Sequence, residues 1–411
     1  MTEVDAAVEH RLDNGGFVKL GACWSQREAE FLYAFAGTPA AADNTIGRLA
    51  WLGRRFDEES LALDAFASLP FSVAGGGNLI VGMDYQKVSA RTDTARGAIA
   101  GRFDLANWDV SGVSRPEVNY SQSQTDDVTR RGLYSQLRLT PLEGLNLIGG
   151  ARLSWYESSA SDGLSGAALS AQKIDAKLTP YLGLTYDLND SLTVYASHTA
   201  MFQPQTALGA DGRPIAPREG RQTEFGLKGA LDGLTLTAAL FDLRDKNRAR
   251  QLPGETAFTA SEAVRVRGLE LEASGQVAPD WQLAAGYVWT QTEYLNGPAS
   301  GAAFSTYTPK HLFKLWAEYD PDTGALAPWS FGLGVTAMSS FSSSVRGVTV
   351  NAPGYATFDA SLGYAIDERT DLRLNVSNLF DREYYTRVGS TSVFNFYGEP
   401  RNATLKLVRR F

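Results

Sequence analysis

The sequence predicts an all-β protein, an antiparallel transmembrane β-barrel, and three observations carry this prediction. Apolar and polar residues alternate along many short segments, tight turns alternate with long polar connections, and no apolar run approaches the roughly 18 residues of a membrane-spanning helix. The composition agrees, since the 411 residues are 44% hydrophobic, 20% charged and 11% aromatic. Such a chain is too polar for a helical membrane protein, whereas barrel strands need only one apolar side.

The alternation has a period of two, as expected of strands. In the segment 372–377, Leu372, Leu374 and Val376 lie on one face, with arginine, asparagine and serine between them. A soluble sandwich also alternates, but its polar face meets bulk solvent, whereas the polar face of a barrel lines a lumen. The segments that show the pattern best are 145–155, 178–186, 192–197 and 372–377.

The connections favour the membrane barrel over the sandwich, because they alternate in length. Short periplasmic turns and long extracellular loops are typical of outer-membrane barrels, and a soluble barrel has no reason to segregate long loops to one end. The tight turns are expected at 12–16, 140–144, 187–191, 231–233, 278–280 and 366–369. The long polar connections are expected at about 90–127, 159–172, 203–219, 295–308, 343–352 and 380–399.

The strand count predicts an incomplete barrel. Counting between these connections gives about 17 strands, the first near 3–12 and the last near 400–411, whereas plugged bacterial transporters have about 22. A barrel that lacks strands exposes an unpaired edge, which lipid does not tolerate, so a stable closed pore is not expected from this chain alone.

One segment breaks the alternation. Val264 and Val266 are apolar at even positions, whereas Leu269 and Leu271 are apolar at odd positions. A β-bulge at Gly268 would account for this change of phase.

Several function classes find no support in the sequence. The one cysteine, Cys23, excludes a disulfide scaffold and a CxxC site, and the net charge of −8 without a basic block gives no indication of a nucleic-acid partner. The histidines His10, His198 and His311 are scattered, so no metal site is expected. Residues 1–12 have neither a basic n-region nor an apolar h-region, so no export signal is expected in this chain.

Two other functions remain as alternatives. An outer-membrane lipase or protease barrel would need a Ser/His or Asp/His arrangement, and the sequence has neither a nucleophile motif nor an HExxH helix, so no enzyme is expected. A passive porin-like or structural outer-membrane barrel satisfies the same physical pattern, and only family motifs argue against it.

Two sets of motifs stand out along the chain. The carboxy-terminal half contains 201–205 (MFQPQ), 219–228 (EGRQTEFGLK), 264–275 (VRVRGLELEASG), 307–311 (YTPKH), 352–355 (APGY), 375–382 (NVSNLFDR), 384–385 (YY) and 398–402 (GEPRN). The amino-terminal half contains 56–64 (FDEESLALD), 81–84 (VGMD) and 103–108 (FDLANW). The first set resembles TonB-dependent ferric-siderophore receptors, and the order and spacing of its motifs make the resemblance specific. The second set is similar to the ferripyoverdine and ferric-coprogen receptor group, which favours a hydroxamate or mixed-chelate siderophore.

The resemblance implies an outer-membrane barrel for ferric-siderophore uptake. In that family a signal peptide, a TonB box and a plug domain precede the barrel. None of the three is expected within residues 1–411. We therefore interpret residues 1–411 as a carboxy-terminal barrel portion that is not competent for uptake alone. The TonB complex would be a partner only through the missing plug and box. The other implied partners are the ferric siderophore, the barrel assembly machinery and outer-membrane lipid. No cofactor is expected, because the siderophore, not the protein, ligates the ferric iron.

Six aromatic residues are candidate siderophore contacts, because aromatic side chains combine apolar contact area with polar edges or hydroxyls. Tyr156 and Tyr294 stand out, since strand parity turns them away from the apolar face. Phe411 resembles the terminal aromatic residue that serves as a barrel-assembly signal in the family. The six candidates are Trp108, Tyr120, Tyr156, Tyr294, Tyr307 and Tyr397.

Overall fold

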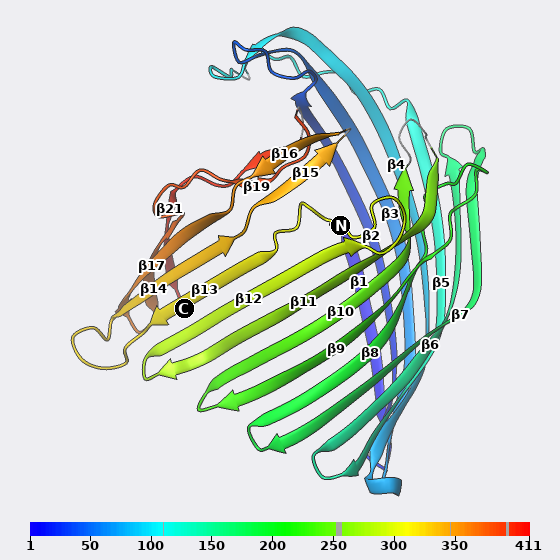
Figure 1. Cartoon of the computed structure of the whole chain (residues 1–411), viewed down its shortest axis with the longest axis vertical. Helices are drawn as coiled ribbons and strands as arrows, with labels where there is room; N and C mark the ends of the chain where they lie inside the picture. The colour runs from blue at the N-terminus through cyan, green and yellow to red at the C-terminus, as the bar shows by residue number, and fades with distance from the viewer. Residues whose placement is uncertain (110, 252–256, 346, 392–393) are drawn as a thin grey trace. The chain divides into compact units, whose positions relative to one another are not determined.

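The computed structural model describes residues 1–109, 111–251, 257–345, 347–391 and 394–411, and in them the protein is antiparallel and all-β (Figure 1). Seventeen strands belong to one sheet, which confirms the count of about 17, and two small hairpins lie apart from it, β15–β16 and β19–β20. No helix among the described residues has the length and apolar character needed to cross a membrane.

The elements follow one another in a simple order. They are β1 (Thr2–Arg11), β2 (Phe17–Ala36), β3 (Thr45–Phe71), the 3₁₀ turn η1 (Val73–Gly75), β4 (Gly77–Asp104), β5 (Gln122–Leu142), β6 (Leu145–Asp162), β7 (Ala168–Asn189), β8 (Leu192–Gln203), β9 (Arg218–Leu231), β10 (Leu234–Gln251), β11 (Phe258–Ala278), β12 (Trp281–Tyr294), β13 (His311–Tyr319), β14 (Trp329–Met338), β15 (Phe341–Val345), β16 (Val348–Ala352), β17 (Tyr355–Asp367), β18 (Thr370–Ser377), β19 (Tyr385–Arg387), β20 (Phe396–Tyr397) and β21 (Asn402–Arg409).

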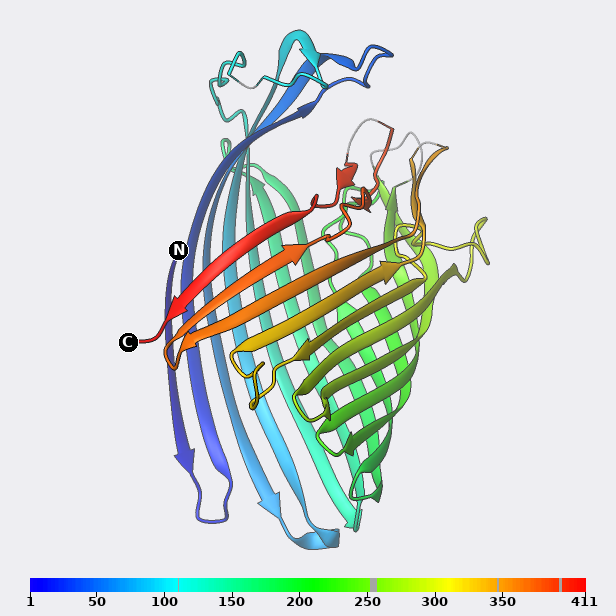
Figure 2. The ribbon, with the colours of Figure 1, turned by 90° about the vertical axis from the view of Figure 1, so that its left-hand side faces the viewer.

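The chain divides into two compact units. Unit 1 comprises Met1–Leu184, His198–Arg221 and Asp245–Ala263, and unit 2 comprises Thr185–Ser197, Gln222–Arg244 and Val264–Phe411. In unit 1, β1 to β6 pair in chain order, as Figure 2 shows for the strands coloured blue to cyan. In unit 2, the pairing runs through β11, β12, β13, β14, β17, β18 and β21.

All six predicted tight turns join consecutive strands. The turn between β9 and β10 shows why: Asp232 and Gly233 have φ values of 42° and 87°, and a two-residue hairpin loop of type I′ needs positive φ at both positions. Asp and Gly are among the residues that adopt this conformation most readily.

One face of the sheet in each unit is apolar, and its apolar residues lie opposite one another from strand to strand. The row in unit 1 crosses six strands: Val8, Leu20, Ala65, Met83, Leu133 and Leu153. The row in unit 2 crosses six strands: Leu283, Ala317, Leu333, Ala360, Val376 and Ala403. Leu20, Met83 and Leu133 are half or more exposed, and so large an exposed apolar surface marks a face that contacts lipid or protein.

The opposite, polar face of unit 1 is held by side chains that each span three strands. Tyr134 of β5 lies across Gly82 of β4, and its hydroxyl donates to Asp64 of β3 at 2.8 Å. In the same way, Arg152 of β6 crosses Gly132 and forms a two-point ion pair with Asp84, at 2.5 and 2.8 Å.

A third link repeats the arrangement. Tyr181 of β7 crosses Gly150 of β6, and its hydroxyl donates to Gln136 of β5 at 2.7 Å. These partners satisfy polar groups that would otherwise be costly on a half-buried surface.

The structure corrects several predicted boundaries. The long connection expected at 90–127 is shorter, because β4 continues to Asp104 and β5 begins at Gln122. The connection at 159–172 shrinks to a turn after Asp162, and those at 343–352 and 380–399 contain the two small hairpins. Within the predicted connections, positions 110, 346, 392 and 393 lie outside the described residues.

The predicted β-bulge at Gly268 is wrong for the pairing of β11 with β12. The register is continuous from Val264 to Gly275, with Gly268 opposite Thr290. Gly268 instead makes room for a ring, because a Cβ there would lie 2.6 Å from Phe241. The change of phase in the sequence arises because the polar face carries an apolar side chain at this point. Val264 lies on that face and is only 1% exposed.

Candidate functional site

The strongest candidate for a ligand surface is an aromatic ladder of Phe31, Tyr33, Phe35 and Phe56 on the polar face of unit 1. The ring centroids of Phe31 and Tyr33 are 5.7 Å apart, those of Tyr33 and Phe35 are 6.0 Å apart, and those of Phe31 and Phe56 are 5.6 Å apart. The three rings of β2 remain 38%, 47% and 41% exposed. A period of two places residues 31, 33 and 35 on one face, and this signal was visible in the sequence.

A cationic side chain accompanies the ladder. Arg54 of β3 lies directly opposite Phe31 of β2. The Nε of Arg54 is buried and has no hydrogen-bond partner among the described residues, which is a costly state for a polar atom. Exposed aromatic faces beside an unused guanidinium N–H suit a flat ligand that carries acceptor oxygens.

The opposite face of the sheet carries a charged cluster made of Arg55 on β3, Arg91 and Asp93 on β4 and Ser123 on β5. Asp93 accepts hydrogen bonds from Ser123 Oγ at 2.6 Å, Arg55 Nη2 at 2.6 Å and Arg91 Nε at 3.0 Å. On this face of β4 the apolar run of Leu79, Val81, Met83 and Tyr85 ends at Lys87, Ser89 and Arg91, so Asp93 lies beyond the membrane-spanning part of the strand. Burial opposes ionisation of Asp93, but the hydrogen bonds from Ser123, Arg55 and Arg91 outweigh it and lower the pKa to about 2.

Tyr120, one of the predicted siderophore contacts, lies next to this charged cluster. Its ring lies 5.0 Å from Arg55 Cζ, and its hydroxyl donates to Glu30 at 3.3 Å. Two residues earlier, Val118 contacts the position of Gly53, where a Cβ would lie 2.8 Å from the valine. The end of the β4–β5 connection therefore covers β3 on the side opposite the aromatic ladder.

The remaining two predicted siderophore contacts of unit 1, Trp108 and Tyr156, differ in how much of each side chain is exposed. Trp108 is 44% exposed, and its ring packs on that of Phe103, with centroids 6.0 Å apart. Tyr156 lies on the polar face, opposite Arg130, whose Cζ is 6.0 Å from the ring. Because Tyr156 is only 5% exposed, a ligand would reach little more than its edge.

Unit 2 contains a cavity rich in hydroxyl groups, and the predicted contacts Tyr294 and Tyr307 are not among its lining residues. Tyr307 is 62% exposed, and Tyr294 lies on the face opposite Leu283, in edge contact with Phe304 at 6.0 Å. The cavity has a volume of 670 Å³, and its lining can hydrogen-bond a polar ligand. Among its lining residues are Thr290, Thr292, Ser305, Thr306, Thr308, Lys310, His311, Ser339, Ser340, Ser342 and Asn351.

Tyr397 is part of a packed arrangement in unit 2. Its ring stacks on Tyr385 with centroids 4.6 Å apart, and Tyr385 Oη donates to Tyr397 Oη at 3.0 Å. Tyr385 in turn packs against a small core of Phe341, Ala352 and Val388. Phe411 follows the end of β21 and is fully exposed, and its role in assembly stays a prediction.

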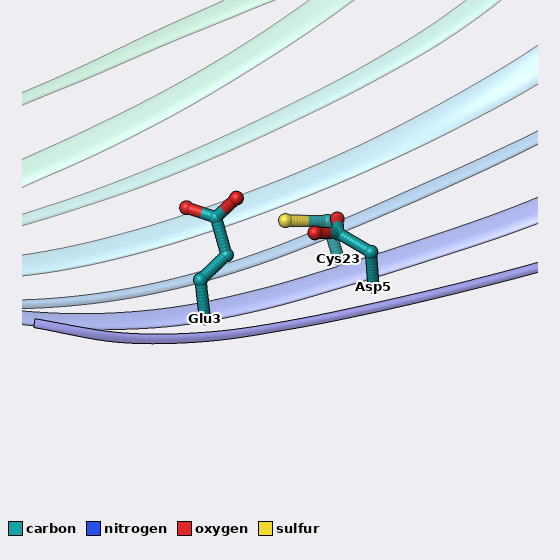
Figure 3. A group of neighbouring side chains, drawn as sticks. All are labelled: Glu3, Asp5 and Cys23. Atoms are coloured by element: carbon teal, nitrogen blue, oxygen red, sulfur yellow. The ribbon is translucent and has the colours of Figure 1, made fainter. Parts of the chain in front are cut away.

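One group of metal-ligating residues comes together that the sequence did not suggest. Oxygen atoms of Glu3 and Asp5 and the Sγ of Cys23 lie within 4.8 Å of one another on the neighbouring strands β1 and β2 (Figure 3). Both carboxylates are exposed to solvent, and such a group carries no function by itself. Of the histidines, His311 Nδ1 is 2.8 Å from the hydroxyl of Tyr287.

Two of the sequence motifs meet in unit 2 and have a structural explanation. Asn378, from the segment 375–382, is 4% exposed and has a φ of 51°. Its side-chain amide donates to the carbonyl oxygens of Arg382 and Glu399 at 2.9 and 3.0 Å, and its Oδ1 accepts from the Arg382 N–H at 2.8 Å. Asp381 Oδ1 accepts from the Arg401 N–H, so the segments 375–382 and 398–402 fix one another.

Comparison with known proteins agrees with this architecture. The family described as TonB-dependent receptor-like β-barrel matches residues 2–379. The ferric-pyoverdine receptor PbuA of a Pseudomonas species is 30% identical over 99% of this chain and 52% of its own length. The catecholate siderophore receptor Fiu of Escherichia coli is 28% identical over 76% of this chain and 48% of its own length.

A solved structure gives the same result. The pyoverdine outer membrane receptor FpvA of Pseudomonas aeruginosa, bound to pyoverdine, aligns with a TM-score of 0.85 and 26% identity over 100% of this chain and 61% of that chain. All three of these proteins are receptors, and this chain spans about half the length of the curated relatives. The family match over most of the sequence shows that the chain belongs to the TonB-dependent receptors of the bacterial outer membrane, and that it corresponds to their β-barrel.

Proposed function

We propose that this chain forms the wall and part of the ligand surface of a ferric-siderophore uptake receptor. The aromatic ladder carries the proposal, because its exposed rings lie on the polar face, in the part of β2 and β3 beyond the apolar rows. Rings of this kind supply contact area for an iron chelate, and the N–H groups of Arg54 can donate to its oxygen atoms. The iron arrives wrapped in its chelator, so no protein ligand is required.

The six aromatic candidates are proposed as additional contacts. Trp108, Tyr307 and Tyr397 have the exposed area that a contact needs. Tyr120, Tyr156 and Tyr294 already pack on neighbouring side chains. By its resemblance to the family, energy coupling to TonB belongs to the plug and the TonB box, whereas the proposed contacts lie on the barrel, so binding is the measurement that tests them.

Titration with ferric pyoverdine tests the proposal, since the relatives named above are receptors for this chelate or similar ones. Tyr33→Ala and Phe35→Ala should each raise Kd about two- to tenfold, because an aromatic contact contributes about 0.5–1.5 kcal/mol beyond its buried area. Phe66→Ala is the matched control: Phe66 pairs edge-on with Phe17 at 5.7 Å on the same face, near the short turns.

Phe66→Ala should leave Kd unchanged. Equal effects of all three substitutions would show that the ladder has no special role. Absence of saturable binding in the wild-type protein would instead favour the passive porin-like or structural barrel.

A further inference from the structure

The apolar face of unit 2 contains a groove of 990 Å³, referred to here as the apolar groove. Small residues make room for it: Gly229 on β9, Ala238 on β10, Ala273 on β11 and Ala285 on β12. Large apolar side chains surround these positions, and they are Leu192, Leu227, Leu231, Leu236, Leu271, Tyr287 and Phe313.

The register shows how the hollow arises. Ala273 lies directly opposite Ala285, so two small side chains are adjacent on β11 and β12. The next row on the same face contains Leu271, Tyr287 and Phe313, which are opposite one another on β11, β12 and β13. The larger row therefore forms a wall beside the smaller one.

The surroundings limit what can occupy the groove. The apolar side chains of its lining lie on the same face of the sheet as the exposed apolar rows. In a membrane barrel this face contacts the hydrocarbon of the bilayer. Water would find few hydrogen-bond partners on this lining, whereas an acyl chain that lies in the hollow gains van der Waals contacts with its walls. A volume of 990 Å³ is at the upper end of the range for small-molecule sites, which is ample for one chain.

The polar end of the groove indicates the headgroup. Asn189, Asp190 and Ser191, from the short turn between β7 and β8, line this end, and short turns lie on the periplasmic side. Asp190 is exposed and negatively charged, and the described lining residues include no lysine, arginine or histidine. Glu272 also borders the groove, but its even position places its side chain on the opposite, polar face of the sheet. A headgroup with an ammonium ion fits this end better than an anionic one.

We propose that the apolar groove binds one acyl chain of a glycerophospholipid of the periplasmic leaflet, with its ethanolamine headgroup beside Asp190. This site is separate from the aromatic ladder and does not depend on the ligand proposed for it.

Native mass spectrometry of the protein, purified from outer membranes in mild detergent, tests the proposal. The wild-type protein should retain one phosphatidylethanolamine molecule. The double variant Ala273→Leu/Ala285→Leu fills the hollow and should retain the lipid several-fold less, because the acyl chain loses its packing contacts with the walls. The control Ala317→Leu/Ala360→Leu adds the same volume to the same face outside the groove, and it should retain the lipid.

Asp190→Lys provides a second test that leaves the groove and the sheet intact. It should shift the retained lipid from phosphatidylethanolamine to the anionic phosphatidylglycerol. Absence of a bound lipid in the wild type, equal retention in the filled variant, or a dimer in place of the lipid adduct would each overturn the proposal. The Kd for ferric pyoverdine, measured on the same samples, should not change, which keeps this outcome distinct from that of the proposed function.

Discussion

At the scale of single residues, glycines on the polar face of unit 1 decide whether the links across three strands can form. A Cβ at Gly150 would lie 2.4 Å from the ring of Tyr181, and a Cβ at Gly82 would lie 2.4 Å from the ring of Tyr134. Each tyrosine reaches its partner two strands away only because nothing projects from the strand between them.

Gly150→Ala should therefore destabilise the protein by about 1–3 kcal/mol, because the Tyr181 ring must move and its hydrogen bond to Gln136 is lost. The neighbouring Gly149 is the control, since a Cβ there meets only Leu182 Cδ2 at an ordinary 3.4 Å. Gly149→Ala should be neutral or slightly stabilising. Unfolding in denaturant measures both, and equal losses in the two variants would contradict this explanation.

Asn378 is the second residue with a specific conformational role. Asn378→Ala removes three hydrogen bonds from a buried position and places alanine at a φ of 51°, so we expect a loss of about 2–4 kcal/mol. Asn375→Ala, from the same motif, changes a strand residue whose side chain forms no such hydrogen bond with the described residues, and it should cost much less. The folded fraction after heating in detergent reports the difference; similar losses would show that Asn378 is an ordinary loop residue.

The sequence predicted the face of many residues but not their partners. Parity placed Tyr156 and Tyr294 opposite the apolar residues of their strands, and the register agrees. It could not show that Tyr156 is nearly buried beside Arg130, because that depends on the neighbouring strand. The aromatic ladder was readable at positions 31, 33 and 35, but Phe56 joins it only through the pairing of β2 with β3.

At the scale of elements, the turns were predictable and the ends of the long strands were not. Residues such as Asp232 and Gly233 determine a tight turn locally, which explains why all six tight turns were found. In contrast, Arg91 and Asp93 look like loop residues in the sequence, yet they lie within β4. The ion pair of Asp93 with Arg55 on β3 and the hydrogen bond from Ser123 on β5 make a polar strand possible here, and such pairing is not visible in one segment alone.

The Asp93 cluster should make the extension of β3, β4 and β5 sensitive to acid. The pKa of Asp93 is about 2 in the folded protein and 3.8 as a reference, so its ionised form stabilises the fold above pH 4. This contribution, about 2 kcal/mol, should disappear as the pH falls from about 4 to 2.

Asp93→Asn provides the measurement. Its unfolding free energy should be lower than that of the wild type at pH 7, and the difference should shrink on acidification towards pH 2. Asp57→Asn, at a neighbouring carboxylate that forms no ion pair among the described residues, should show little difference at either pH. A deficit in Asp93→Asn that does not vary with pH would contradict the assignment.

At the scale of the whole molecule, the two faces of the sheet determine where the protein resides. The apolar rows of both units extend across strand after strand, and the family match places such sheets in the outer membrane. This level of organisation was the most predictable from sequence, because it depends only on a period of two repeated in many strands.

Leu63→Arg tests the assignment of the faces. Leu63 is 42% exposed on the apolar face, and an arginine there should cost about 2–4 kcal/mol if the face lies in the bilayer core. Ala62→Arg places the same side chain one residue away on the polar face and should be tolerated better. Folding titrations in lipid vesicles compare the two, and a larger penalty for Ala62→Arg would reverse the faces.

Photo-crosslinking with a diazirine-bearing analogue of ferric pyoverdine tests the ligand surface most directly. The protein is irradiated in detergent with and without excess ferric pyoverdine, and the labelled residues are mapped by mass spectrometry. We expect labels at Phe31, Tyr33 and Phe35, beside Arg54, and we expect excess ferric pyoverdine to suppress them. Labels confined to the apolar face, for example at Leu63 or Met83, or labels that excess ligand does not suppress, would contradict a siderophore site on the aromatic ladder.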